Sequence, residues 1–205
     1  LLPGGLHVGF AIVTSIWETF SDDLNLRGVL ETILNVKSER SEHIGQRGQG
    51  HFEFSCEVDH ICGVGILSLR VQKFLDEHQP QWTAADSQKP SVEWCKTQAR
   101  AYLQSLRDRE WGADDRREWL ELEYAWRVSV LRLFCVARRN GCVKGLMACL
   151  HEFGPMLFSS TTHPYKQDEI LSILIGKEML DDRRYDTYLR HCIALRLSGS
   201  ANGLD

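Results

Sequence analysis

The apolar positions in the first 36 residues repeat with the period of a helix. They recur three or four residues apart, as on one face of a helix with about 3.6 residues per turn: Leu6, Phe10, Val13 and Trp17. Pro3 suits the first turn of this helix, because the N–H that proline lacks would have no partner there. After a polar break, Ser21 or Asp22 can cap a second helix. The pattern predicts a helix pair over residues 1–36.

The period changes after a polar, glycine-rich connector at residues 37–50, which we expect to be flexible. Beyond it, apolar side chains occupy every second position: Phe52, Phe54, Cys56 and Val58. Alternation of this kind is typical of a half-buried strand. Asp59 and His60 can turn the chain into a second strand around residues 64–71. We therefore predict a small β-hairpin over residues 51–71.

Helical spacing returns after a loop at residues 78–90. One helix is predicted to begin at Ser91, and the longest to run over residues 115–139 and to stop at Asn140-Gly141. Shorter helices are expected at residues 142–153, 167–179 and 181–197, before a disordered tail from residue 198. The buried stripe of the longest helix is assigned to Trp119, Leu122, Trp126, Val130, Leu133 and Ala137.

These elements predict an α+β fold that is mostly α. It consists of an N-terminal helix pair, a small β-hairpin over residues 51–71 and a C-terminal helical bundle over residues 91–197. Residues 1–36 and 51–197 are expected to pack as one compact unit. With 205 residues, 43% of them hydrophobic, the chain can bury a sizeable core. No uncharged apolar run approaches the ~18–20 residues of a membrane span, which favours a soluble protein.

The net charge and the cysteine pattern disfavour some classes of function and some cellular compartments for this protein. The net charge of −4 argues against dedicated nucleic-acid binding, which depends on a basic surface. One local group of basic residues does not change this balance: Arg132, Arg138, Arg139 and Lys144. The seven cysteines follow no disulfide-framework spacing, so a reducing compartment such as the cytoplasm is expected.

A metal site has one weak candidate. Cys56, His60 and Cys62 lie close together in the chain and would share one face of a strand. A structural zinc site needs four ligands, however, and a fourth residue at suitable spacing is missing from the sequence nearby. Ordinary core cysteines are the simpler interpretation, and no cofactor is predicted.

Catalytic patterns are also lacking. No local signature joins a nucleophile to a histidine and a carboxylate, and the segment GQRGQG lacks the lysine and the context of a phosphate-binding loop. Glu118, Glu121 and Glu123 are expected on a solvated helix face. The tryptophans are assigned to the core rather than to a stacking platform: Trp111, Trp119 and Trp126. The sequence therefore predicts a protein without enzymatic activity of its own.

The start of the chain resembles an F-box module. Such modules begin with Leu-Pro-x-x-Leu, and Leu2, Pro3 and Leu6 match these positions. The order of elements that follows is similar to that of the "P-zero" RNA-silencing suppressors of poleroviruses and enamoviruses. The chain departs from the family pattern because it has no proline between Pro3 and Pro80.

This resemblance implies a function through protein contacts in the cytoplasm of a plant host cell. The F-box-like segment would recruit the Skp-type adaptor of a host cullin ubiquitin ligase, through Leu2, Pro3 and Leu6. The remainder would engage an ARGONAUTE protein so that it is degraded. A homo-oligomer is also compatible with the sequence.

Alternatives stay open from the sequence alone. Leu6, Val13 and Trp17 can face either a partner's groove or the protein's own bundle. A suppressor that sequesters small duplex RNA would need a basic face, and a hydrolase or metal protein would use Cys56, His60 and Cys62.

Overall fold

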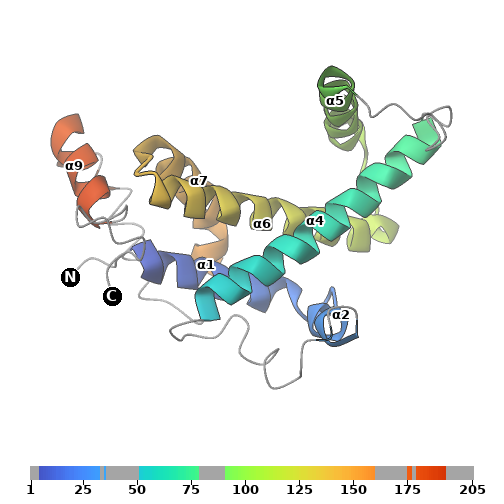
Figure 1. The fold of residues 1–205 in the computed structure, drawn as a ribbon, viewed down its shortest axis with the longest axis horizontal. Helices are drawn as coiled ribbons and strands as arrows, with labels where there is room; N and C mark the ends of the chain where they lie inside the picture. The colour runs from blue at the N-terminus through green and yellow to red at the C-terminus, as the bar shows by residue number, and fades with distance from the viewer. Residues whose placement is uncertain are drawn as a thin grey trace.

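The computed structural model describes residues 5–32, 35, 51–78, 91–159, 175–176 and 179–192. All regular elements in these ranges are helices (Figure 1): α1 (Gly5–Phe20), α2 (Leu26–Thr32), α4 (His51–His78), α5 (Val92–Asp108), η1 (Ala113–Asp115), α6 (Arg116–Arg139), α7 (Val143–Ser159) and α9 (Asp182–Cys192). The prediction of a mostly helical protein is confirmed. None of the described helices is long and apolar enough to cross a membrane.

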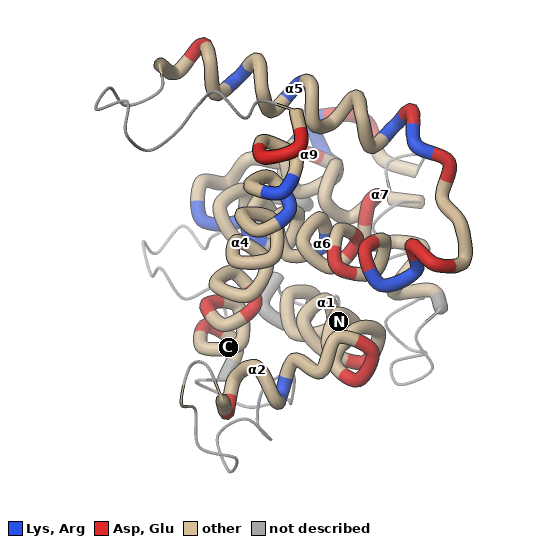
Figure 2. Tube along the Cα trace, turned by 90° about the vertical axis from the view of Figure 1, so that its right-hand side faces the viewer, with Lys and Arg blue, Asp and Glu red and all other residues tan. Residues whose placement is uncertain are grey.

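Helix α1 is largely buried and packs against α4, α6 and α7. Glu18 is its single charged residue, and Figure 2 shows the helix uncharged along most of its length. A helix that is apolar on all sides is stable only when other elements surround it. Its buried side chains point in several directions: Val8, Ala11, Ile12, Val13, Ser15, Ile16, Trp17 and Phe20.

The predicted β-hairpin over residues 51–71 is wrong, because these residues form the first three quarters of helix α4. Alternation at residues 52–58 is too short to decide between a strand and a helix. Helical spacing also fits this segment, and it places Phe52, Ser55 and Asp59 on one buried face. Packing against α1 and α6 stabilises this helix despite Gly63 and Gly65.

The predicted buried stripe of α6 is partly wrong. Trp119, Trp126 and Leu133 are exposed by 47%, 53% and 61%, and Trp111 before the helix is also exposed. The helix has apolar residues on two faces, and periodicity alone does not show which face is inside. The inner face carries Tyr124, Ala125, Val128, Val130, Leu131, Phe134, Ala137 and Arg138.

Several helix ends agree with the sequence. The side chain of Ser91 accepts a hydrogen bond from the backbone N–H of Trp94 and caps α5. Helix α6 stops before Gly141, whose φ of +62° is the left-handed conformation that glycine adopts readily. Neither Ser21 nor Asp22 caps α2, because the chain makes a turn through Asn25, with φ of 50°, before that helix begins.

Helix α7 is longer than predicted and includes Pro155. The expected helix at residues 181–197 is described as α9 up to Cys192. Other expectations lie mainly or wholly outside the described residues: the connector at 37–50, the loop at 78–90, the helix at 167–179 and the tail from residue 198.

Candidate protein-docking surface

Helices α4 and α6 run antiparallel and leave an apolar groove between them on the molecular surface. The groove has a volume of about 320 Å³. Its apolar walls are strongly exposed: Val64 by 48%, Leu67 by 39%, Leu133 by 61% and Val136 by 47%. The remaining lining residues are His60, Gly63, Val128, Ser129 and Arg132. We call this feature the α4–α6 groove.

Three residue pairs fix the register of the two helices: Glu53 with Arg139, Gly63 with Val128, and Arg70 with Glu121. Arg70 lies seven positions after Gly63 on α4, and Glu121 lies seven positions before Val128 on α6, so the two helices keep the same register. The helices approach closely at Gly63, where an added Cβ would lie 3.0 Å from Cγ1 of Val128. Gly63 thus forms the floor of the α4–α6 groove.

Ion pairs hold the far end of the two helices together. Glu118 lies 3.2 Å from Arg70 and 2.9 Å from Arg109, while Arg70 also pairs with Glu121. The carboxylate side chains of Glu118 and Glu121 are only 19% and 18% exposed. The prediction that they form a solvated face is therefore wrong. Arg109 also pairs with Asp115, which links the segment after α5 to the start of α6.

A buried polar contact joins the inner faces of the same helices. Asp59 and Tyr124 are fully buried, and the Tyr124 hydroxyl donates a hydrogen bond of 2.9 Å to Oδ1 of Asp59. Burial raises the pKa of Asp59 to about 7, although Tyr124 and the nearby indole of Trp17 favour the charged carboxylate. The burial and the Asp59 charge raise the pKa of Tyr124 as well.

Leu2 and Pro3 lie outside the described residues, and Leu6 belongs to α1 without a described side chain. The structure therefore does not place the F-box-like side chains. Further along α1, Val13 is 1% exposed and Trp17 is 5% exposed. These two residues pack inside the protein's own bundle.

The weak metal candidates do not converge. Cys62 is buried, whereas Cys56 and His60 are half-buried. In a helix, Cys56 and His60 lie near one face, but Cys62 points away from them because each residue advances the helix by about 100°. Among the described residues, no group of three His, Cys, Asp or Glu side chains could hold a metal ion.

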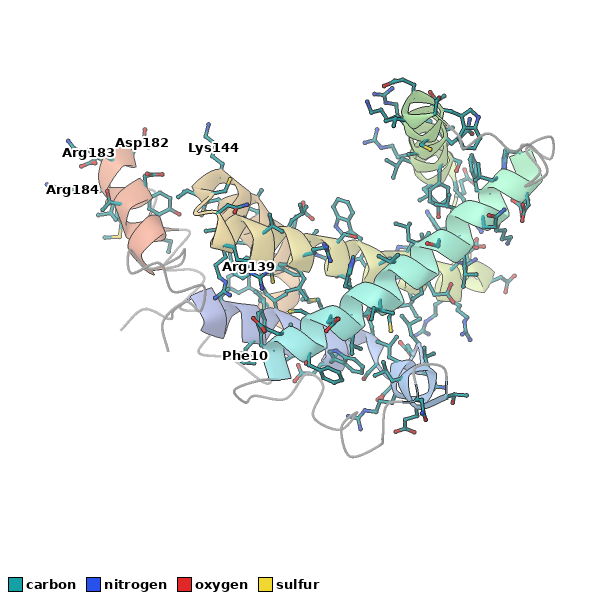
Figure 3. The ribbon with its side chains drawn as sticks, viewed as in Figure 1. Phe10, Arg139, Lys144, Asp182, Arg183 and Arg184 are labelled. Atoms are coloured by element: carbon teal, nitrogen blue, oxygen red, sulfur yellow. The ribbon has the colours of Figure 1, made fainter. Side chains whose placement is uncertain are left out.

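The local group of basic residues singled out in the sequence does not form one exposed basic surface in the described part of the chain. Arg138 is buried, and Arg139 lies 3.7 Å from Glu53. Figure 3 shows Lys144 on α7 pointing away from the body, and Arg183 and Arg184 on α9 likewise.

Sequence reasoning missed the α4–α6 groove because it assigned Val64 and Leu67 to a strand and Leu133 to the core. It also placed Asp59 in a turn. A helical interpretation of residues 51–78 would have revealed both features, since residues 60–69 contain no Asp, Glu, Lys or Arg.

Comparison of the chain with protein families, curated proteins and solved structures finds no match.

Proposed function

We propose that the protein is a non-enzymatic adaptor that suppresses RNA silencing in a plant host cell. One part would recruit the Skp-type component of a host cullin ubiquitin ligase, and the helical body would hold an ARGONAUTE protein for degradation. The observation that carries this proposal is the exposed apolar α4–α6 groove, together with the Leu-Pro-x-x-Leu sequence at the start of the chain, whose last leucine lies in the first turn of α1.

The groove suits a helical segment of a partner. Val64, Leu133 and Val136 expose about half or more of their surface, whereas apolar residues of this kind are stabilised by contact with other apolar groups. Contiguous exposed apolar surfaces commonly mark protein interaction sites. A partner helix can lay its own apolar face between two helices and cover such residues. Arg132 and His60 at the same groove would favour acidic residues beside that face.

Recruitment of the ligase is assigned to Leu2, Pro3 and Leu6. Val13 and Trp17 are buried, so the contact involves the beginning of α1 rather than its whole length.

The recruitment half is tested by co-purification with a plant Skp-type adaptor. The Leu2→Ala/Pro3→Ala variant is expected to lose binding, while the matched Leu1→Ala/Gly4→Ala variant keeps it. Circular dichroism of both variants checks that they fold. Equal binding by both variants and the wild type would rule out Leu2 and Pro3 as the contact.

The target half is tested with charges placed in the α4–α6 groove. Val64→Glu/Leu133→Glu is expected to abolish co-purification of ARGONAUTE and to restore its abundance in plant cells. Leu69→Glu/Leu103→Glu is the matched control, because these leucines are 72% and 58% exposed and do not line the groove. Retained ARGONAUTE binding by the groove variant would contradict the assignment.

A further inference from the structure

Cys56 on α4 and Cys135 on α6 face each other across the helix pair. The register described above places them together: seven residues back from Gly63 lies Cys56, and seven residues on from Val128 lies Cys135. Seven residues make about two helical turns, so side chains at this spacing return to nearly the same face. Glu53 and Arg139 continue the same register one turn further. Consistent with this geometry, the largest cause of the pKa shift of each thiol is the other cysteine of the pair.

The surroundings of the pair shift the pKa values of its two thiols in opposite directions. The interaction with Cys56 and the positive charges of Arg138 and Arg139 lower the pKa of Cys135. The same interaction and burial raise the pKa of Cys56. Arg138 is 7% exposed, and its Nη1 has no hydrogen-bond partner among the described residues. A buried guanidinium of this kind is suited to stabilise a thiolate beside it.

Both cysteine residues are also partly exposed, unlike the cysteines of the core. Cys56 and Cys135 are half-buried, whereas Cys62 and Cys149 are buried. Cys95 is exposed on α5, which contacts the body mainly near Phe74 and Tyr102. The pair therefore combines partial exposure, a neighbouring positive charge and a second thiol, which are the properties of redox-sensitive cysteines.

We propose that Cys56 and Cys135 are a peroxide-sensitive thiol pair that closes to an intramolecular disulfide. The Cys135 thiolate attacks one oxygen of hydrogen peroxide, the O–O bond breaks, and hydroxide leaves. Cys135 is then a sulfenic acid. The sulfur of Cys56 attacks the sulfur of Cys135, the S–O bond breaks, and water leaves with the proton of the Cys56 thiol. The hydroxide takes up the proton that Cys135 released when it ionised, so in total two thiols are oxidised and one peroxide is reduced to two water molecules.

The disulfide would join α4 to α6 at the end of the helix pair opposite the Arg70–Glu121 ion pair. In a reducing compartment it forms only under peroxide stress and is reversed by thiol reductants. This inference is independent of the adaptor proposal, because it concerns the chemistry of the isolated chain.

The test is mild oxidation of the purified, reduced, full-length protein with hydrogen peroxide. Digestion without reductant and mass spectrometry are expected to recover a cross-link between the peptides that contain Cys56 and Cys135, with a loss of two hydrogens. Dithiothreitol should reverse it. The Cys95→Ser variant, as a matched control, should form the cross-link at the wild-type rate.

Two further variants distinguish the roles of the thiols. The Cys56→Ser variant should accumulate a sulfenic acid at Cys135, which dimedone traps. In the Cys135→Ser variant, the most reactive remaining thiol should react with peroxide about tenfold more slowly than the most reactive thiol of the wild type. The proposal is overturned if the folded wild-type protein, with its circular dichroism unchanged, forms no such cross-link. It is equally overturned if peroxide modifies Cys95 faster than Cys135.

Discussion

Tyr124 on α6 donates a hydrogen bond of 2.9 Å to Asp59 on α4, and both side chains are completely buried. The bond joins the inner faces of the helices whose outer faces form the α4–α6 groove. It leaves Oδ2 of Asp59 without a hydrogen bond of normal geometry among the described residues. Asp59 is therefore incompletely compensated, and its charged form is costly inside the core.

This burial makes the stability of the protein depend on pH. The pKa of Asp59 is about 7 in the folded chain, above the ordinary value of 3.8. The folded state holds this proton more tightly, so the contribution of Asp59 to the free energy of unfolding falls as the pH rises from about 4 to about 7. Asp59→Asn removes this titration. We expect the variant to gain about 1–3 kcal/mol relative to the wild type between pH 5 and pH 8.

Urea denaturation of both proteins at each pH measures this difference. Other titrating groups contribute equally to the two proteins and cancel in the comparison. If the unfolding free energies of the wild type and the Asp59→Asn variant change in parallel with pH, Asp59 does not titrate in this range.

The close approach of α4 and α6 at Gly63 is tested against Gly65 on the same helix. An added Cβ meets nothing within 4 Å at Gly65 but lies 3.0 Å from Val128 at Gly63. Gly65→Ala should stabilise the protein by about 0.5–1 kcal/mol, because alanine favours the helix. Gly63→Ala should be less stable than Gly65→Ala by about 1–2 kcal/mol, since the helices must separate slightly. If thermal denaturation shows the same stabilisation for Gly63→Ala and Gly65→Ala, the close contact between α4 and α6 does not lie at Gly63.

The ion pairs around Glu118 should contribute more than an exposed pair. Glu118 is 19% exposed and bonds both Arg70 and Arg109. Glu118→Gln is expected to cost about 1–2 kcal/mol of unfolding free energy. Glu93→Gln is the matched control, because its pair with Lys96 is largely exposed and should contribute about 0–0.5 kcal/mol. If Glu118→Gln and Glu93→Gln lower the unfolding free energy by the same amount in low salt, the ion pairs of Glu118 contribute no more than the exposed pair.

The orientation of α6 is tested by removing one aromatic side chain from each face. Phe134 is completely buried and Trp126 is 53% exposed. Phe134→Ala should cost about 3–5 kcal/mol, whereas Trp126→Ala should cost less than about 1 kcal/mol. The denaturant concentrations at the unfolding midpoints of the two variants, each compared with the wild type, measure these losses. A larger loss at Trp126 would mean that the helix presents its other face to the core.

Most helices could be predicted where periodicity and end signals agree. Ser91 marks the start of α5, and Asn140-Gly141 marks the end of α6. In α4 the local signals conflict, because Gly63 and Gly65 weaken a helix and residues 52–58 alternate. Only the contacts of α4 with α1 and α6, distant in the sequence, resolve that conflict.

The candidate surface was harder to predict for the same physical reason. Whether Leu133 or Leu131 is buried depends on which face of α6 meets α1, and local sequence does not contain that information. Leu2, Pro3 and Leu6 could be identified as a motif from sequence, but their exposure depends on packing.

The enclosed position of α1 has a consequence for deletion mapping. A truncated chain that begins at Ser21 would lose the buried helix that packs against α4, α6 and α7. Small domains unfold as a whole rather than in parts. An N-terminal truncation would therefore disrupt the α4–α6 groove as well as remove the Leu-Pro-x-x-Leu motif. Single substitutions ahead of α1 are the way to separate ligase recruitment from the integrity of the body.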